Sequence, residues 1–317
     1  MAPTPSRPER RDLLSLRDLT DDQVRHLVRR GVDFAEGRAA DPAVADAIVG
    51  IYFRKTSTRT RTSFSAAALR LGAKTIAYGP ADLQENTGET PEDTALVLSG
   101  MLDCLVARTA GSDRELRVLA AHPGMGVINA MSETEHPTQG LADCTMMARR
   151  FGRMDGLRVL YAGEGNSTAT ALALSASRFP GVRLELRTPP GYGVDPDILA
   201  ESQAHAKRNG GEVLERHDMA DLPERLDAVH TARWQTTGSS KADPDWRTGF
   251  EPFRVDAAVL AATGATVFMH DLPAHRGEEV TAEVLDGPRS IAFPQAHNKL
   301  FGAMAALEWS LGGGGDA

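Results

Sequence analysis

The sequence has 317 residues, of which 41% are hydrophobic and 25% are charged, and its formal net charge is −8. This composition is typical of a globular protein of about two domains, and the negative charge argues against a nucleic-acid partner. Two cysteines are too few for a disulfide framework, which favours a reducing cytoplasm. No apolar run reaches the roughly 18 residues of a membrane helix, so no membrane partner is expected. We interpret the polar start, MAPTPSRPERRD, as a disordered tail rather than a signal peptide, and the end, GGGGDA, as a flexible tail.

The first half of the chain alternates short apolar runs with helical patterns. The capping-box spacing of Thr20 and Gln23 predicts the first helix. Strands are expected at 47–53, 75–79, 104–109 and 126–130. Helices are expected between them, near 61–72, 90–102 and 113–121.

The second half repeats this alternation. Strands are expected at 157–163, 182–188, 212–217, 227–232 and 266–272, and helices near 167–179, 195–209 and 254–263. Strands that alternate with helices indicate parallel sheets. We therefore predict an α/β fold of two domains, each a parallel sheet flanked by helices. Long helices would bridge them: one near 137–151 connects the domains, and the last, about 295–311, packs back on the first. The predicted domains are residues 1–140 and 141–294.

Ligands of parallel α/β sheets bind beyond the carboxyl ends of the strands, so the polar turns there are candidate sites. The most polar turn, FRKTSTRTRTSF, follows a strand and opens a helix. It concentrates hydroxyl and guanidinium groups in Ser57, Thr58, Arg59, Thr60 and Arg61. Free N–H groups at a helix start, hydroxyls and arginines all suit a phosphate. A capped, solvated helix start is the alternative.

Two further turns carry candidate groups. Arg108 ends an apolar strand, where it is either a surface residue or a ligand group. In SETEHPTQGLAD, Pro137 predicts a helix start with His136 beside it and Gln139 one turn in. A neutral histidine or a glutamine amide can donate to a carbonyl oxygen, while a simple capped turn is the alternative.

The second half offers weaker signals. In HTARWQTTG, the period of two places Arg233 and Gln235 on one side of an extended segment, where they could clamp a carboxylate or form an exposed loop. The glycines of YAGEGNST lack the rest of a dinucleotide fingerprint. A metal site of His270, Asp271 and His275 has suitable ligand types but no recognised spacing, so we expect His270 to be a satisfied histidine at a strand end.

Together, these motifs resemble the aspartate/ornithine carbamoyltransferase family. Ser57-Thr58-Arg59-Thr60-Arg61 matches its carbamoyl-phosphate motif, and His136-Pro137-Thr138-Gln139 matches its second motif. Arg108 stands at the position where the family has a third phosphate ligand. HDLPAHRGEEV (270–280) is similar to the signature of the ornithine branch.

The resemblance implies roles for these residues. Ser57, Thr58, Arg59, Thr60 and Arg108 would bind the phosphate. Arg108, His136 and Gln139, with Thr60, would address the carbamoyl group. Arg276 would also reach carbamoyl phosphate, and Arg61 would support the site without touching it. Gln84 would reach a neighbouring subunit's site in a homotrimer. No metal or organic cofactor is implied.

The acceptor side departs from the ornithine branch. Ala232 stands where that branch has Asp, Asp271 where it has Cys, and Ser167 where it has a second Asn, although Asn166 is kept. Arg233-x-Gln235 instead resembles a carboxylate-gripping pair of the aspartate branch. The expected acceptor-binding residues are Asn166, Arg233, Gln235, Asp271 and Leu272.

We therefore expect carbamoyl transfer to an amine of an amino acid or of an amino-acid-derived acceptor, which gives a ureido product and phosphate. A diamino-acid unit is the favoured acceptor, and a 2,3-diaminopropionate unit, as in antibiotic biosynthesis, is one candidate. The alternatives are an ornithine carbamoyltransferase of arginine biosynthesis and a non-catalytic homologue that binds carbamoyl phosphate.

Overall fold

The computed structural model describes residues 10–39, 44–109, 111–236 and 240–312. Residues 1–9 and 313–317 of the two predicted tails lie outside these ranges. Residues 10–12 were also assigned to the disordered tail, and this was wrong: the Arg10 guanidinium lies 2.7 Å from the Asp103 carboxylate, and the Arg11 N–H donates to the Ser310 carbonyl at 3.1 Å.

The first sheet has four parallel strands in the order β2-β1-β3-β4. Their bounds are β1 Ile48–Phe53, β2 Lys74–Tyr78, β3 Cys104–Arg108 and β4 Gly126–Asn129. Helices α2 (Arg59–Arg70), α3 (Pro91–Ser99) and α4 (Asp113–Leu119) connect them. Strands β1 and β3 are apolar on both faces because helices cover both sides, whereas β2 is a partly exposed edge.

The second sheet has five parallel strands in the order β7-β6-β5-β8-β9. Their bounds are β5 Arg158–Ala162, β6 Arg183–Arg187, β7 Glu212–Arg216, β8 Ala228–Thr231 and β9 Val267–His270. Its helices are α6 Ser167–Ala176, α7 Pro196–Arg208, α8 Trp246–Phe250, α9 Ala257–Thr263 and α10 Ala282–Leu285. In each sheet the strand order reverses once, beside β1 and beside β5, which is where α/β sheets bind ligands.

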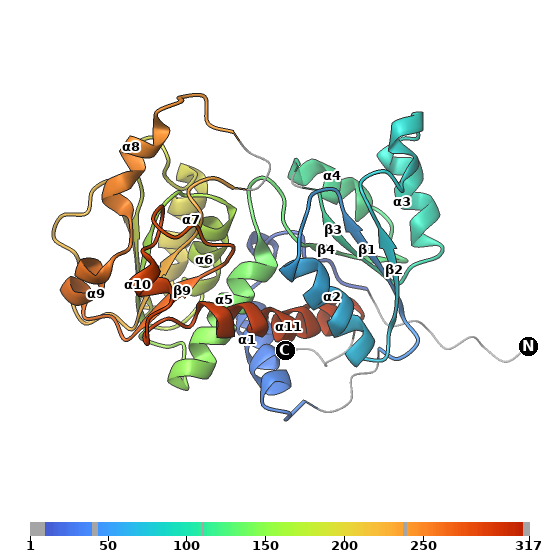
Figure 1. Ribbon diagram of the computed structural model, residues 1–317. Coiled ribbons are helices and arrows are strands. Elements are labelled where there is room, and N and C mark those ends of the chain that lie inside the picture. The colour runs from blue at the N-terminus through green and yellow to red at the C-terminus, as the bar shows by residue number, and fades with distance from the viewer. Residues whose placement is uncertain (1–9, 40–43, 110, 237–239, 313–317) are drawn as a thin grey trace, which may run out of the picture.

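Three helices join the two lobes: α1 (Asp21–Ala35), α5 (Pro137–Phe151) and α11 (Ala292–Ser310). Helix α5 lies between the lobes and α11 crosses beneath them (Figure 1). Helix α11 packs against α1, α2 and α5 and also touches β9. Buried Arg178 adds a polar tie, because it donates to the carbonyls of Leu16 and Leu19 at 3.0 and 3.1 Å. The lobes therefore share a continuous core.

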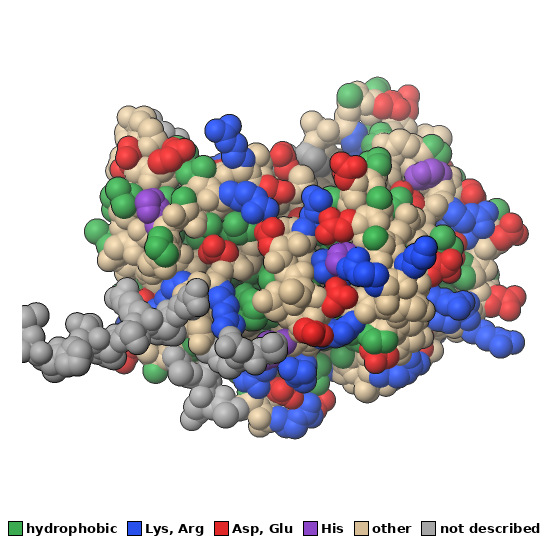
Figure 2. Space-filling model, turned by 180° about the vertical axis from the view of Figure 1, so that it is seen from behind, with side chains coloured by type: hydrophobic (Ala, Val, Ile, Leu, Met, Phe, Trp, Pro, Cys, Tyr) green, Lys and Arg blue, Asp and Glu red, His purple; other side chains and the backbone are tan. Residues whose placement is uncertain are grey.

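The predicted α/β fold class is confirmed, and the Thr20–Gln23 capping box is present. The domain boundary near residue 140 stays a prediction. Helix α2 begins two residues earlier than expected, and β9 ends at His270, two residues early. Helices α8 and α10 were missed because four or five residues show no helical period. None of the described helices has the length and apolarity to cross a membrane. Figure 2 shows acidic and basic side chains interspersed over one face.

Candidate active site

A cavity of about 340 Å³ lies where the carboxyl ends of the two sheets meet. Its first-domain lining residues are Thr56, Ser57, Thr58, Arg59, Thr60, Arg108, Met131, His136 and Gln139. The remaining lining residues are Asn166, Ser167, Thr168, Arg233, Gln235, Thr236, Asp271, Leu272, Pro273 and Lys299. Its charged lining side chains are four cations and one carboxylate, Asp271, so the cavity is suited to an anion.

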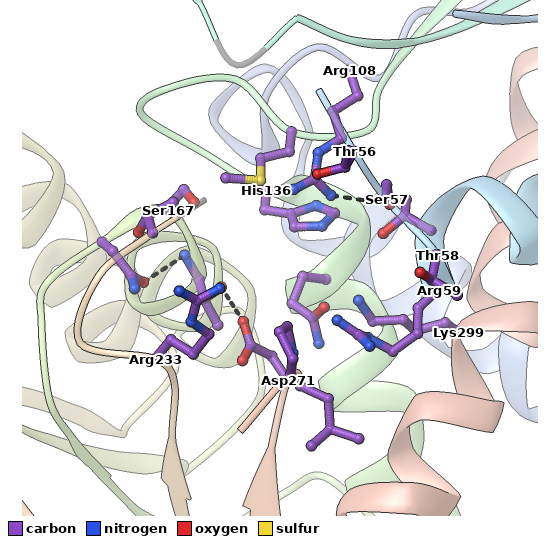
Figure 3. A pocket seen from close by; sticks show the side chains of 18 of the residues that line it. Thr56, Ser57, Thr58, Arg59, Arg108, His136, Ser167, Arg233, Asp271 and Lys299 are labelled. Atoms are coloured by element: carbon purple, nitrogen blue, oxygen red, sulfur yellow. Dashed lines mark hydrogen bonds between the residues drawn. The ribbon is translucent and has the colours of Figure 1, made fainter. Parts of the chain in front are cut away.

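One wall is the start of helix α2. Thr58 is the N-cap, yet its hydroxyl makes no capping bond among the described residues, so it remains available to a ligand. The first N–H groups of a helix have no partner within the helix and favour an anion. Arg108, at the end of β3, is only 8% exposed and donates to the Ser57 hydroxyl at 3.3 Å. Ser57, Thr58, Arg59 and Arg108 thus face one side of the cavity (Figure 3).

The floor is the start of helix α5. His136 is its N-cap, and its backbone N–H reaches the Ser167 carbonyl of the second lobe at 3.2 Å. Burial, together with the positive charges of Lys299 and Arg108, holds the pKa of His136 well below its usual value. The imidazole is therefore neutral at physiological pH and offers one donor and one acceptor.

Gln139 is oriented by a second buried group. Its amide nitrogen donates to the Asp143 carboxylate at 2.7 Å, and its Oε1 is buried with no partner among the described residues. Asp143 also accepts from Gln295 of α11 at 2.6 Å and lies 3.4 Å from His230 of β8. Because the nitrogen is committed to Asp143, Gln139 presents an acceptor. The sequence had suggested a donor.

The opposite wall holds Asp271, just past β9. Its carboxylate accepts a hydrogen bond from the Thr168 hydroxyl at 2.9 Å. Burial acts to raise the pKa of Asp271, but neighbouring His270 and Lys299 lower it by more, so Asp271 is a carboxylate at neutral pH. Asp271 and Arg233 lie across the cavity from Arg59 (Figure 3).

Lys299 of helix α11 completes the set of cations. Burial lowers its pKa to about 8, against the opposing effects of Asp271 and Asp143. Burial likewise lowers the pKa of Arg108 to about 10 and that of Arg59. Both arginines stay charged at neutral pH, while Lys299 is the cation nearest to its titration.

The domain models of one family cover nearly the whole chain. Residues 11–149 match the aspartate/ornithine carbamoyltransferase carbamoyl-P binding domain, and residues 155–310 match the Asp/Orn binding domain. The chain belongs to the aspartate/ornithine carbamoyltransferase family. This confirms the prediction that it is a carbamoyltransferase.

Individual relatives agree along the full length. The chain is 36% identical to an ornithine carbamoyltransferase of Gloeobacter violaceus over 306 residues, covering 96% of each chain. It is 37% identical to that of Nitrosococcus oceani, covering 95% of this chain and 97% of the relative. The solved structure of ornithine carbamoyltransferase from Pyrococcus furiosus superimposes with a TM-score of 0.87 at 32% identity, covering 96% and 98%. The resemblance to the ornithine branch is thus confirmed.

Among the residues predicted for the site, the structure brings all but Gln84 and Arg276 to the cavity. Gln84 is exposed in the 3-10 helix Gln84–Thr87. Arg276 is exposed and forms a two-pronged ion pair with Asp286 at 2.7 and 2.8 Å. Arg61 is exposed on α2 and does not line the cavity, as expected.

The geometry does not support the alternative of a metal site at His270, Asp271 and His275. His270 is buried and, as predicted, is a satisfied histidine, because its Nδ1 accepts the Leu272 N–H at 2.8 Å and its Nε2 lies 3.1 Å from Glu279. Of the three residues considered, His275 alone joins a cluster of possible ligand atoms within the described part of the chain, together with Glu278 and Glu279.

The structure adds lining residues that the sequence reasoning missed, chiefly Thr168 and Lys299. A lysine inside the apolar pattern of the last helix, QAHNKLFGAMAAL, was the available signal for Lys299. Thr168 gave none, because a threonine in the first turn of a helix is ordinary.

Proposed function

We propose that the protein transfers the carbamoyl group of carbamoyl phosphate to a side-chain amine of a diamino acid. The observation that carries this proposal is the cavity between the two sheets, where four cationic side chains face one carboxylate. The relatives are named ornithine carbamoyltransferases, so ornithine is the first acceptor to consider, in arginine biosynthesis.

The phosphate of the donor would lie at the start of α2. The hydroxyls of Ser57 and Thr58 and the free N–H groups of the helix would donate to it, and Arg59 and Arg108 would balance its charge. Arg108 is buried and touches Ser57, so it is held in place before the ligand arrives. A preorganised donor set of this kind suits a small, labile dianion.

The carbamoyl group would lie between α2 and α5. The free oxygen of Gln139 would accept an N–H of the carbamoyl amide. Neutral His136 and the Thr60 hydroxyl, with Arg108 and Lys299, would surround the carbonyl oxygen. Removing one such donor costs about 2.7–4 kcal/mol of transition-state stabilisation.

The reaction then needs no covalent enzyme intermediate. The lone pair of the uncharged amine forms an N–C bond to the carbamoyl carbon, and the carbonyl oxygen becomes an oxyanion. The oxyanion collapses, the C–O bond to phosphate breaks, and phosphate leaves with that electron pair. The amine proton passes to the departing phosphate. Holding both substrates in one cavity can lower the activation barrier by roughly 7–11 kcal/mol.

The acceptor would bind beside Asp271. The carboxylate of Asp271 suits the ammonium group of the acceptor that does not react, and Arg233 and Gln235, with Asn166, supply partners for an amino-acid carboxylate. A second candidate acceptor, shorter than ornithine, is a 2,3-diaminopropionate unit of specialised metabolism. The observation that favours it is the position of the carboxylate: Asp271 lines the cavity and accepts from the Thr168 hydroxyl, while Ala232, at 1% exposure, does not line it.

We also propose a cytoplasmic homotrimer. Support comes from exposed apolar side chains of α3 and the turn after it, Leu96, Val97 and Met101, at 50–66% exposure. Gln84 precedes these three residues in the same lobe. A second copy of the chain packed against α3 would cover the three apolar side chains and would place Gln84 near the neighbouring subunit. Light scattering at the mass of three chains would support this, and a monomer would contradict it.

Phosphate release from carbamoyl phosphate tests the function. The amines would be ornithine, 2,3-diaminopropionate, putrescine, aspartate and lysine, with product masses recorded. Release that depends on one diamino acid would support transfer and name the acceptor. Carbamoyl phosphate binding without release for any amine would instead favour the non-catalytic alternative.

A further inference from the structure

The geometry points to Lys241 as a positioning residue for the acceptor wall: its ammonium group, held by an aromatic cage and by Glu164, fastens the segment that carries Arg233 and Gln235. Lys241 does not line the cavity itself. The fastening stands on geometry alone, whereas its effect on acceptor binding rests on the proposed function.

The ammonium group of Lys241 is surrounded by rings. Its Nζ lies 4.8 Å from the centroid of Tyr192 and 5.1 Å from those of Trp246 and Phe250. It also forms an ion pair with Glu164, and the Lys241 side chain is only 6% exposed. A cation near a desolvated aromatic face gains up to about 2 kcal/mol. Lys241 is thus a built-in ligand of a cation site.

The rings of the cage also pack against one another. Phe250 packs against Tyr192, Trp246 and Trp234 with ring centroids 4.8, 5.1 and 5.6 Å apart. Trp234, Trp246 and Phe250 are all buried and form a cluster of their own within the second lobe. Aromatic pairs at such distances stabilise one another beyond the area they bury.

The cage is joined to the cavity through Trp234. Trp234 lies between Arg233 and Gln235, which both line the cavity. The chain bends at Trp234 and Gln235, so Trp234 lies in the aromatic cluster while its two neighbours line the cavity. Lys241 enters the same cluster, so the chain is fastened both before and after Gln235 and Thr236.

The cage is joined to the cavity a second time through Glu164. Glu164 is two residues before Asn166, which lines the cavity and caps α6. The Tyr161 hydroxyl donates to the Glu164 carbonyl at 2.8 Å, and the Gly165 N–H donates to the Tyr192 carbonyl at 2.7 Å. A Cβ at Gly165 would lie 2.2 Å from the Gly193 carbonyl carbon, so only glycine fits where this turn packs against the 192–194 backbone. The Lys241–Glu164 pair therefore connects the chain after Gln235 and Thr236 to the turn that leads into α6.

The experiment compares Lys241→Met, Lys241→Arg and Glu164→Gln with Arg247→Met as the control. Arg247 lies over Trp246 at 4.5 Å, but its side chain is 54% exposed. We expect Lys241→Met to raise the acceptor KM about tenfold or more, with the carbamoyl phosphate KM within about twofold because α2 is untouched. Lys241→Arg should keep most of the affinity, and Arg247→Met should match the wild type.

A second readout needs no turnover. Amide hydrogen exchange in residues 230–236 should be faster in Lys241→Met than in the wild type and unchanged in Arg247→Met. An unchanged acceptor KM with unchanged exchange would overturn the proposal, as would an equal rise in both KM values, which would mark a general folding role. A wild type without any acceptor turnover would instead remove the proposed function, and exchange alone would then decide whether Lys241 fastens this segment.

Discussion

The Thr168 hydroxyl donates to the Asp271 carboxylate at 2.9 Å, which joins the first turn of α6 to the end of β9 inside the cavity. Burial lowers the pKa values of Arg59, Arg108 and Lys299, and the negative charge of Asp271 opposes that lowering. Asp271 is thus the one carboxylate among the cations that line the described cavity. Its effect on acceptor binding can be separated from its effect on carbamoyl phosphate binding.

Asp271→Asn keeps the shape of the side chain and removes its charge. We expect kcat/KM for the acceptor to fall by about tenfold to a hundredfold, because an ammonium group loses a charged partner. The affinity for carbamoyl phosphate should hold or rise, since a negative charge near the anion site is gone. Steady-state kinetics with each substrate varied would check this. A weaker affinity for carbamoyl phosphate, with the acceptor unaffected, would contradict the assignment of Asp271.

Asp143 fixes which end of the Gln139 amide faces the cavity. Asp143→Asn can donate as well as accept, so it should let the amide turn and present its nitrogen. We expect kcat to fall about tenfold or more, with thermal stability nearly unchanged because the change is isosteric. Gln139→Glu should be more damaging, since two carboxylates would then lie 2.7 Å apart, as the two groups do now. Full activity of Asp143→Asn would show that Gln139 does not need this orientation.

The pKa of Lys299 predicts an alkaline limb in carbamoyl phosphate binding. Burial lowers this pKa to about 8, so the positive charge is lost as the pH rises through that value. With the acceptor concentration held constant, kcat/KM for carbamoyl phosphate should fall above pH 8, because this ratio reports the enzyme form that binds carbamoyl phosphate. His136 is already neutral well below pH 6.5 and adds no change there. Lys299→Arg should move the limb to higher pH, and an unmoved limb would assign it to another group.

The position of Arg276 differs between the family resemblance and the structure. The motif placed it at carbamoyl phosphate, whereas its guanidinium is exposed and paired with Asp286. We expect Arg276→Ala to leave both KM values and kcat within about twofold and to change stability by less than about 1 kcal/mol, as for other surface pairs. A large loss of kcat would show that Arg276 turns into the cavity when substrates bind.

Much of the fold could be predicted because its strands are short apolar runs separated by helical periods, and the strand-then-helix order fixes parallel sheets. The phosphate wall was equally accessible, since Ser57 to Thr60 are consecutive and lie at one turn. Lys299 was not, because its element is remote in sequence and only packing brings α11 beneath the cavity. The orientation of Gln139 depends on Asp143 and Gln295, and no local pattern contains that information.

Formation of a carbamoylated product tests the central claim most directly. Carbamoyl phosphate would be incubated with ornithine or with 2,3-diaminopropionate, and the ureido product and phosphate would be quantified together. The wild type should form the ureido product and phosphate in equal amounts. Arg108→Met should lower kcat by about a hundredfold to a thousandfold. Arg114→Met, an exposed arginine of the neighbouring helix α4, should match the wild type. Equal product from wild type and Arg108→Met, or phosphate without any ureido product, would contradict carbamoyl transfer in this cavity.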